Sequence, residues 1–426
     1  MPTGSGSAKE QGTGVVHDQQ SFGIPQPASV KTDNRINTLD FMRGVSMFFV
    51  FYTHFAINWN TSDWTSWCLF QWTVLDFMGI TSFTGLSVLG TMIACFKRKE
   101  KGDLRLLPAS TLLRALYLFI LGQFLNIAAQ WYMGVDLIFA SNILFAIAIF
   151  SILTPLILKL NYKTRFLFAG AIIILYYPFL NWAFSGLTEA GITALQITLA
   201  NMGDPRVVVY YFLFDHAMMT PLFPWLIIPF FMTTIFESLI KALNHGDFQV
   251  ISHELKKIAV IGALIIACSI AVGFPLTRGY SWWEVDQLTT PGFFFTWPIH
   301  AVPLFYDRNT INMIVFNIGS FCIVFFMIGY VQLIWKKRFP WEDKMANFGR
   351  LSLTGFMLSE LAYALGFIKL PLFLFYAIFI PLFILIVNAF WYWSNTLKGK
   401  FTLEWLSVIF VSIISRSFSK TRKGDE

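Results

Sequence analysis

An arginine and a histidine, Arg43 and His54, lie eleven positions apart in a segment that is otherwise almost wholly apolar. A helix turns by about 100° and rises about 1.5 Å per residue, so the two side chains lie within about 20° of one face and roughly 16 Å apart. Ionisable groups inside a bilayer are costly unless they face a bundle interior or a water-filled cavity. If this segment is a membrane helix, the pair predicts a functional site, with Asp40 one turn before Arg43.

The residue type of His54 suits proton transfer. The pKa of a free imidazole is about 6.5, so His54 can act as a catalytic general base toward a hydroxyl or an amine. Asp76 lies near the outer end of the second apolar segment, at the predicted depth of His54. It is a candidate catalytic carboxylate that orients the imidazole. The alternative for His54 is a buried histidine that hydrogen-bonds a neighbouring helix.

The residue type of Arg43 suits anion binding, because a guanidinium can hold phosphate or pyrophosphate through two parallel hydrogen bonds. Together with Asp40 it forms a candidate cofactor-binding site at the inner mouth of a cavity. Two other roles stay open for Arg43. It could extend to the interface as a positive anchor, or it could pair with Asp40 three residues earlier.

A third group of polar residues opens the sixth apolar segment, which reads FDHAMMTPLFPWLIIPFF. Its prolines interrupt the helical hydrogen bonds and free carbonyl groups that a cavity or neighbouring helices must satisfy. We therefore predict a substrate-binding site that includes Asp215, His216 and Trp225. The remaining polar residues in or near apolar segments favour structural roles, and they are Asp136, Asn142, His300 and Glu360.

The segments that must position these side chains are strongly apolar. Of the 426 residues, 56% are hydrophobic and 13% are charged, and the mean hydropathy is +0.61. This composition predicts an all-α, polytopic membrane helix bundle. About ten windows are long enough to cross the hydrocarbon layer, namely 39–58, 73–96, 110–130, 137–158, 165–185, 216–240, 257–276, 311–334, 350–368 and 371–394. The expected organisation is a disordered cytoplasmic tail over 1–36, the bundle over 37–396, and a cytoplasmic or interfacial amphipathic tail over 397–426.

Basic residues cluster in alternate connections between these windows. The clusters are Lys97, Arg98, Lys99, Lys101 and Arg105; Lys159, Lys163 and Arg165; Lys256 and Lys257; and Lys336, Lys337, Arg338 and Lys344. The positive-inside rule places them and both termini in the cytoplasm of a multi-pass plasma-membrane protein. The net charge of +7 is concentrated in these connections, so it needs no nucleic-acid partner to explain it.

Several chemical signatures are absent from the sequence. It contains no Gly-x-x-x-x-Gly-Lys-Ser/Thr phosphate loop, no His-Glu-x-x-His and no Gly-x-Ser-x-Gly motif. Its four cysteines have neither the spacing of a metal site nor that of a disulfide framework. We therefore expect neither ATP hydrolysis nor a metal-dependent reaction.

The stretch RINTLDFMRG at 35–44 resembles a stretch in the transmembrane acyltransferase superfamily that leads into the first membrane helix. Within it, Arg43 and His54 match the arginine and histidine pair of the acyltransferase-3 family. Three other stretches resemble a sister branch, the heparan-alpha-glucosaminide N-acetyltransferase-like proteins: PLFPW at 221–225, FGRLSLTGFMLSE at 348–360 and TLEWL at 402–406. That branch usually has asparagine in place of His54 and Asn-Tyr in place of Gly355 and Phe356, so this chain combines features of both branches.

The resemblance implies transfer of an acyl group, acetyl above all, from acetyl-CoA on the cytoplasmic side to a hydroxyl or amine of an outward-facing sugar or glycan. It implies that Arg43 meets a CoA phosphate and that His54 removes the acceptor proton. The expected partners are therefore membrane lipid and a glycan, while assembly into a homo-oligomer is left open.

Two other function classes fit the same residues. The polar stripe of the first helix could serve as the proton relay of a transporter or flippase for a small solute or lipid-linked glycan. The long connections at 186–215 and 277–310, the second rich in aromatic residues, could form the binding surface of a non-catalytic membrane sensor or scaffold. Covalent change to the acceptor separates the enzyme from both.

The charge pattern makes a testable prediction about sidedness. The 97–105 connection is strongly basic and should be cytoplasmic, while the 277–310 connection contains only Arg278 and Arg308 as basic residues and should lie outside. In a chain with its native cysteines replaced, Asp286→Cys should react with an impermeant thiol reagent added to intact cells, and Lys99→Cys should not. The reverse labelling pattern would place His54 on the cytoplasmic side.

Overall fold

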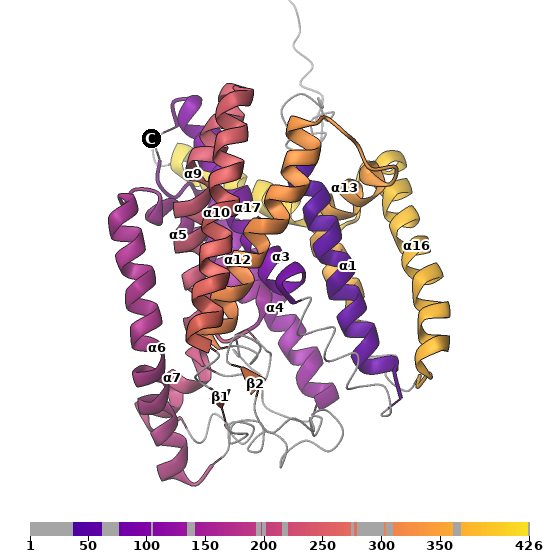
Figure 1. Cartoon of the computed structure of the whole chain (residues 1–426). Coiled ribbons are helices and arrows are strands. Elements are labelled where there is room, and N and C mark those ends of the chain that lie inside the picture. The colour runs from indigo at the N-terminus through magenta and orange to yellow at the C-terminus, as the bar shows by residue number, and fades with distance from the viewer. Residues whose placement is uncertain are drawn as a thin grey trace, which may run out of the picture. The chain divides into compact units, whose positions relative to one another are not determined.

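The computed structural model describes residues 37–61, 76–103, 105–133, 141–192, 197, 202–214, 220–273, 277–278, 302–303, 310–360 and 368–424, within one compact unit that spans Asn37–Glu426. Its helices are α1 (Asn37–Trp59), η2 (Asp76–Met78), α3 (Ile80–Glu100), α4 (Ala109–Met133), α5 (Ile143–Ile157), α6 (Tyr162–Ala190), α7 (Pro205–Leu213), α8 (Leu222–Trp225), α9 (Ile227–His245), α10 (Phe248–Gly273), α12 (Ile311–Gly329), η5 (Tyr330–Ile334), α13 (Glu342–Arg350), α14 (Ser352–Ser359), α16 (Leu372–Thr396) and α17 (Leu403–Gly424) (Figure 1). Two short strands, β1 (Thr277–Arg278) and β2 (Val302–Pro303), pair in antiparallel fashion. The expected helical fold is therefore confirmed.

Seven helical segments in the described part of the chain are long and apolar enough to cross a membrane. They are Ile80–Glu100, Ala109–Ala128, Tyr162–Ala190, Leu222–Asn244, Phe248–Val272, Ile311–Ile334 and Leu372–Thr396. The other three predicted windows hold α1, which carries Asp40 and Arg43, and the shorter helices α5 and α14. Ten crossings and cytoplasmic termini thus remain predictions.

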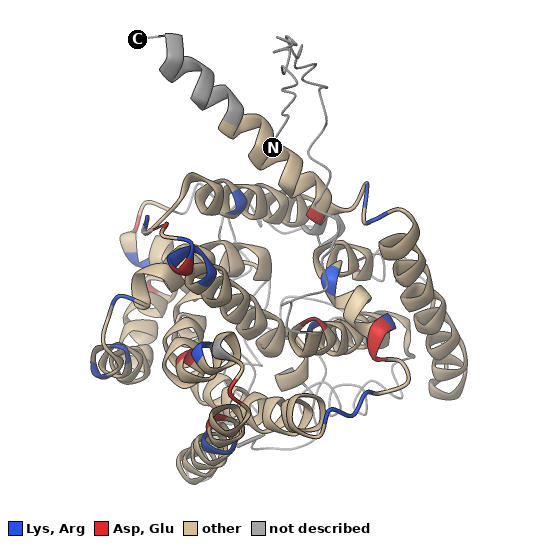
Figure 2. Cartoon of the chain, turned by 90° about the horizontal axis from the view of Figure 1, so that it is seen from above, with Lys and Arg blue, Asp and Glu red and all other residues tan. Residues whose placement is uncertain are grey.

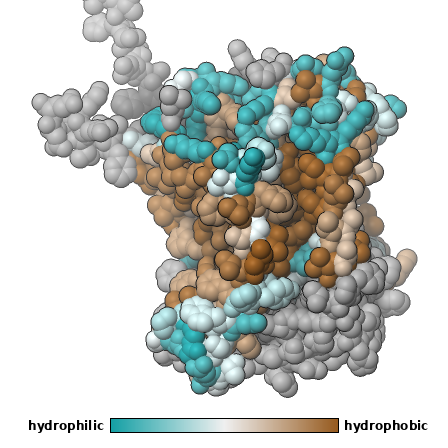
Figure 3. Space-filling view, turned by 60° about the vertical axis from the view of Figure 1, so that its left-hand side comes forward, coloured by the Kyte–Doolittle hydropathy of each residue, from teal (hydrophilic) through white to brown (hydrophobic). Residues whose placement is uncertain are grey.

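The surface of the bundle carries a broad apolar belt between two polar ends (Figure 3). Large apolar side chains project outward from the long helices, among them Ile174 of α6 and Phe373 and Leu385 of α16. Water would penalise exposure on this scale, whereas lipid tails solvate it without cost. The chain is therefore a multi-pass membrane protein.

Basic connections that are far apart in sequence meet at one end of the bundle, which Figure 2 views from above. The amide of Asn244, at the end of α9, donates to Glu100 Oε1, at the end of α3, at 3.0 Å. The ammonium of Lys336, after η5, lies 4.5 Å from the ring centre of Phe248 at the start of α10. The alternate connections in which the sequence places its basic residues thus lie at one end of the bundle, called the basic end below.

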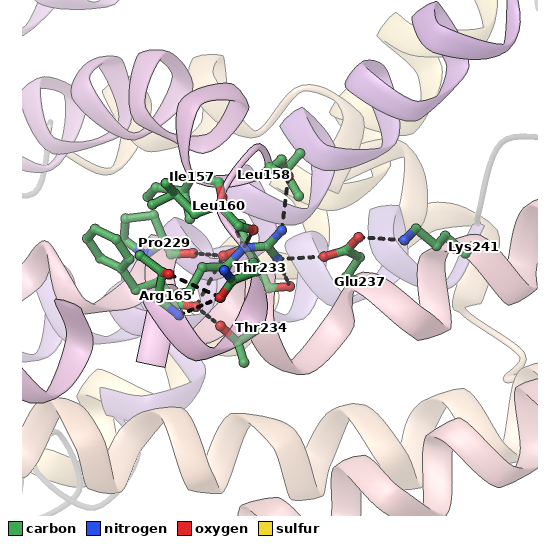
Figure 4. Close-up of polar contacts among 12 residues, drawn as sticks. Ile157, Leu158, Leu160, Arg165, Pro229, Thr233, Thr234, Glu237 and Lys241 are labelled. Atoms are coloured by element: carbon green, nitrogen blue, oxygen red, sulfur yellow. Dashed lines mark hydrogen bonds and ion pairs between the residues drawn. The ribbon is translucent and has the colours of Figure 1, made fainter. Parts of the chain in front are cut away.

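Arg165 differs from the other residues of the basic clusters, because its side chain is buried with 3% exposure (Figure 4). It donates to the carbonyl oxygens of Ile157, Leu158, Leu160 and Thr233 at 2.9–3.1 Å. It also pairs with Glu237, which binds Lys241 as well, each at 2.5 Å. The guanidinium therefore satisfies carbonyls at the end of α5 and joins α5, α6 and α9, a structural role that its position in a basic cluster did not indicate.

Two glycines allow α1 and α13 to cross at backbone contact. A Cβ atom on Gly44 would overlap the carbonyl group of Met345, and one on Gly349 would overlap the carbonyl oxygen of Asp40. Only glycine permits so close an approach, because the opposing atoms are backbone and cannot rotate away. The crossing brings Arg350, the last residue of α13, beside Asp40.

Gly349→Ala should therefore destabilise the protein by about 2 kcal/mol or more, the scale of overpacking against a rigid neighbour. Gly170→Ala in α6 is the matched control, because nothing lies within 4 Å of the added Cβ atom. Thermal unfolding of the detergent-purified variants would measure the difference. Equal melting temperatures would show that α1 and α13 do not cross this closely.

Candidate active site

His54 lies on α1, as predicted, and its ring meets the end of α14. The Nδ1 atom is 3.1 Å from Ser359 Oγ and 3.5 Å from Glu360 Oε1. The Phe356 ring stands edge-on to the imidazole, with ring centres 6.2 Å apart. A ring and a hydroxyl from α14 and the carboxylate of the residue that follows it thus lie on one side of His54.

The hydrogen bonds of Ser359 indicate which nitrogen of His54 carries the proton. The Ser359 hydroxyl donates its single hydrogen to the carbonyl oxygen of Phe356 at 2.6 Å. Ser359 Oγ must then accept from His54, which requires a proton on Nδ1, and the neighbouring Glu360 carboxylate favours the same arrangement. In the neutral imidazole Nε2 is therefore the basic nitrogen, the tautomer that a general base needs when a carboxylate holds its other nitrogen.

The carboxylate beside His54 is thus Glu360, for which the sequence favoured a structural role. Asp76, the predicted partner, begins η2, and its side chain lies outside the described residues. The pairing of residues 54 and 360 has no local sequence signal, because it joins helices separated by most of the chain. The available hint was a single carboxylate in an otherwise apolar window.

Asp40 and Arg43 form the pair that their spacing allowed, and a third charged residue joins them. Arg43 Nη1 lies 3.3 Å from Asp40 Oδ1, and Arg350 Nε lies 3.2 Å from Asp40 Oδ2. Arg43 Nη2 also donates to the carbonyl oxygen of Leu86 on α3 at 3.1 Å. The carboxylate is buried, while the side chains of Arg43 and Arg350 are 21% and 25% exposed. These three residues sum to one positive charge; the sequence had not singled out Arg350.

Both ends of the Arg43–His54 stripe face the region where α1 meets α3 and α14. Arg43 contacts α3 through Leu86. The ring of Phe356, beside His54, stacks on Phe83 of α3 with centres 6.3 Å apart. Between Arg43 and His54 on the same face, Met47 and Val50 are fully buried. Apolar side chains therefore fill the path between the two polar groups.

The predicted substrate-binding residues are only partly described. Asp215 and His216 lie outside the described residues. Trp225 ends α8, and its buried indole N–H has no hydrogen-bond partner among them. The main neighbours of α8 are α6, α7, α9 and α12. Asn142 has the expected structural role: it caps α5 through Phe145 N and donates to Gly122 and Asn126.

These features define the class of protein: a membrane protein whose apolar helices enclose a polar site. The site contains His54, Glu360 and an arginine cluster, by which we mean Arg43 and Arg350 with the Asp40 carboxylate they share. A family model described as "Heparan-alpha-glucosaminide N-acetyltransferase, catalytic" matches residues 35–272, more than half of the chain. The chain belongs to this family and is a membrane acetyltransferase. The match includes Asp40, Arg43 and His54 and ends before Ser359 and Glu360. No curated protein and no solved structure matches the chain.

If Glu360 orients His54 and stabilises its imidazolium form, Glu360→Gln should lower the rate of acetyl transfer by about 100-fold. The glutamine amide has a similar size but no charge to stabilise the imidazolium. Ser359→Ala should cost less, about tenfold, because Glu360 still faces Nδ1. The measurement is release of radiolabel from acetyl-CoA in membranes that contain equal amounts of each variant. Glu254→Gln is the control, because this carboxylate of α10 pairs with Lys257 and not with a residue of the site. Wild-type rates in Glu360→Gln would remove this carboxylate from the reaction.

Proposed function

We propose that the chain transfers an acetyl group from acetyl-CoA, which enters at the basic end of the bundle, to a hydroxyl or amine of a sugar or glycan on the opposite side of the membrane. Membership of the heparan-alpha-glucosaminide N-acetyltransferase family supports acetyl transfer, and the name of that family supports a glucosaminide-like acceptor. The observation that carries the proposal is the contact of His54 Nδ1 with Ser359 and Glu360, which assigns the proton of the neutral ring to Nδ1 and makes Nε2 the basic nitrogen.

In the proposed reaction, His54 Nε2 takes the proton of the acceptor hydroxyl or amine while the acceptor atom bonds to the thioester carbonyl carbon. The carbon–sulfur bond then breaks, and the imidazolium returns the proton to the departing CoA sulfur, so that His54 ends in its starting state. The Glu360 carboxylate stabilises the imidazolium between these two steps. Asp76 stays a second candidate for this role.

The arginine cluster supports the placement of the donor. Arg43 and Arg350 share the single carboxylate of Asp40, so the three residues retain a positive charge that favours the phosphates of CoA. About 16 Å of helix separates Arg43 from His54, a distance comparable with an extended pantetheine arm. Met47 and Val50 fill this path, so the arm reaches His54 only when these side chains shift.

The acceptor is proposed to bind at the opposite end, near the start of the sixth apolar segment. A buried indole N–H without an acceptor is costly, and a substrate oxygen would satisfy it. This supports Trp225 as a substrate-binding residue, and Asp215 and His216 precede it by ten and nine residues.

The test combines membranes, radiolabelled acetyl-CoA and a panel of glycans that carry free amines or hydroxyls. Label should appear on a glycan, and His54→Ala should lower that rate by about 100-fold or more without loss of folded protein. Arg43→Ala and Arg350→Ala should instead raise the KM for acetyl-CoA by about tenfold each, which corresponds to about 1.4 kcal/mol.

Arg105→Ala is the matched control, because this exposed arginine also lies in a basic connection but pairs with Asp103. An equal effect of Arg105→Ala would assign the loss to general surface charge. Uptake or flipping of an unmodified glycan, with full activity in His54→Ala, would favour the transporter instead.

A further inference from the structure

We propose that Glu404, at the start of α17, is a positioning residue that holds α14 in register with His54; this inference rests on the function proposed above. Glu404 lies 44 positions after Glu360, and it acts on the opposite end of α14. Its contacts link the TLEWL stretch, which has no other role in the proposed reaction, to the stretch FGRLSLTGFMLSE that ends at Ser359 and Glu360 beside His54.

The first turn of α14 depends on Glu404 for its hydrogen bonds. The residue at the cap position is Leu351, whose side chain has no acceptor. Glu404 Oε1 accepts from the backbone N–H groups of Leu353 and Thr354 at 2.7 and 3.2 Å, and its Oε2 accepts from Thr354 Oγ1 at 2.6 Å. A carboxylate at a helix N-terminus satisfies unpaired N–H groups and favours the helix dipole.

The cap is reciprocal, because α14 also caps α17. Thr354 Oγ1 accepts from the backbone N–H of Leu403 at 2.9 Å. The arrangement resembles a capping box, except that its two halves belong to different helices. Tyr117 of α4 donates to the Leu403 carbonyl oxygen at 3.1 Å and thus fixes the same turn of α17 to the bundle. The start of α14 is therefore tied through α17 to α4.

The short length of α14 carries this restraint to His54. The helix has only eight residues, and so short a helix is not stable on its own in the absence of caps and packing. About 9 Å of helix separates Leu353 from Ser359. Loss of the cap lets the first turn fray, and the helix then rotates or shifts at Ser359 and Glu360, which face Nδ1 of His54.

The substitution Glu404→Ala tests this role. It should lower kcat by about tenfold, on the scale of a sub-ångström to 1 Å misplacement, and leave the KM for acetyl-CoA unchanged. Glu404→Gln should restore kcat, because its amide oxygen accepts from both N–H groups and its NH₂ group donates to Thr354 Oγ1. Glu254→Ala removes a carboxylate from α10 and is the matched control.

Hydrogen exchange of the 352–360 peptide gives a second readout that needs no activity. Exchange should rise in Glu404→Ala and stay at the wild-type level in Glu404→Gln. If Glu404→Ala fails to fold, Thr354→Val should reproduce the loss of kcat and Thr354→Ser should not, since only serine retains the hydroxyl.

The outcomes separate this inference from the proposed function. Wild-type kcat and unchanged exchange in Glu404→Ala, with His54→Ala inactive, would overturn the positioning role alone. Equal losses in the Ala and Gln variants would also overturn it, since the hydrogen bonds would then not be the cause. A wild-type protein that transfers no acetyl group would overturn the proposed function, while the exchange measurement would still decide whether Glu404 holds α14.

Discussion

A charged group inside an apolar bundle is costly unless another part of the protein compensates it, and this constraint organises much of the described structure. Asp40 is compensated by Arg43 and Arg350, Arg165 by carbonyl groups and Glu237, and Glu404 by the free N–H groups of α14. Removal of one partner would leave the other unpaired in a medium without water, at a cost of several kcal/mol. Each polar group therefore fixes the relative position of the helices it joins.

The division between α13 and α14 is a consequence that matters for the site. α13 ends at Arg350 and α14 begins at Ser352, at the start of the window predicted over 350–368, and Leu351 between them has φ −106° and ψ 33°, outside the helical region. The break creates an additional pair of helix ends, which need compensation and receive it from Glu404. It also lets one short stretch of chain place Arg350 beside Asp40 and Ser359 beside His54.

Local periodicity was enough to predict part of this arrangement. The helix through Arg43 and His54, the spacing that pairs Asp40 with Arg43, and the alternation of basic connections all depend on residues near one another in sequence. Glu360, Arg350 and Glu404 were missed as partners because each acts across a large sequence separation, where one sequence contains no pairing information. Arg165 illustrates a different limit. Its place among basic residues indicated a loop, and only the carbonyl groups around it reveal that it is buried.

The separation of the arginine cluster from His54 also bears on how the proposed reaction would cross a membrane. Movement of a phosphate through the bundle would require its charge to leave both water and the arginines, at a cost of several kcal/mol. An extended pantetheine arm avoids this, because its charged end can stay beside Arg43 and Arg350 while a neutral thioester spans about 16 Å to the imidazole. Met47 and Val50 suit such a path, since apolar side chains can admit a neutral arm but exclude water and ions. In the proposed reaction the fully buried stretch between the two polar groups would act as the permeability barrier, and only the neutral arm and its acetyl group would pass it.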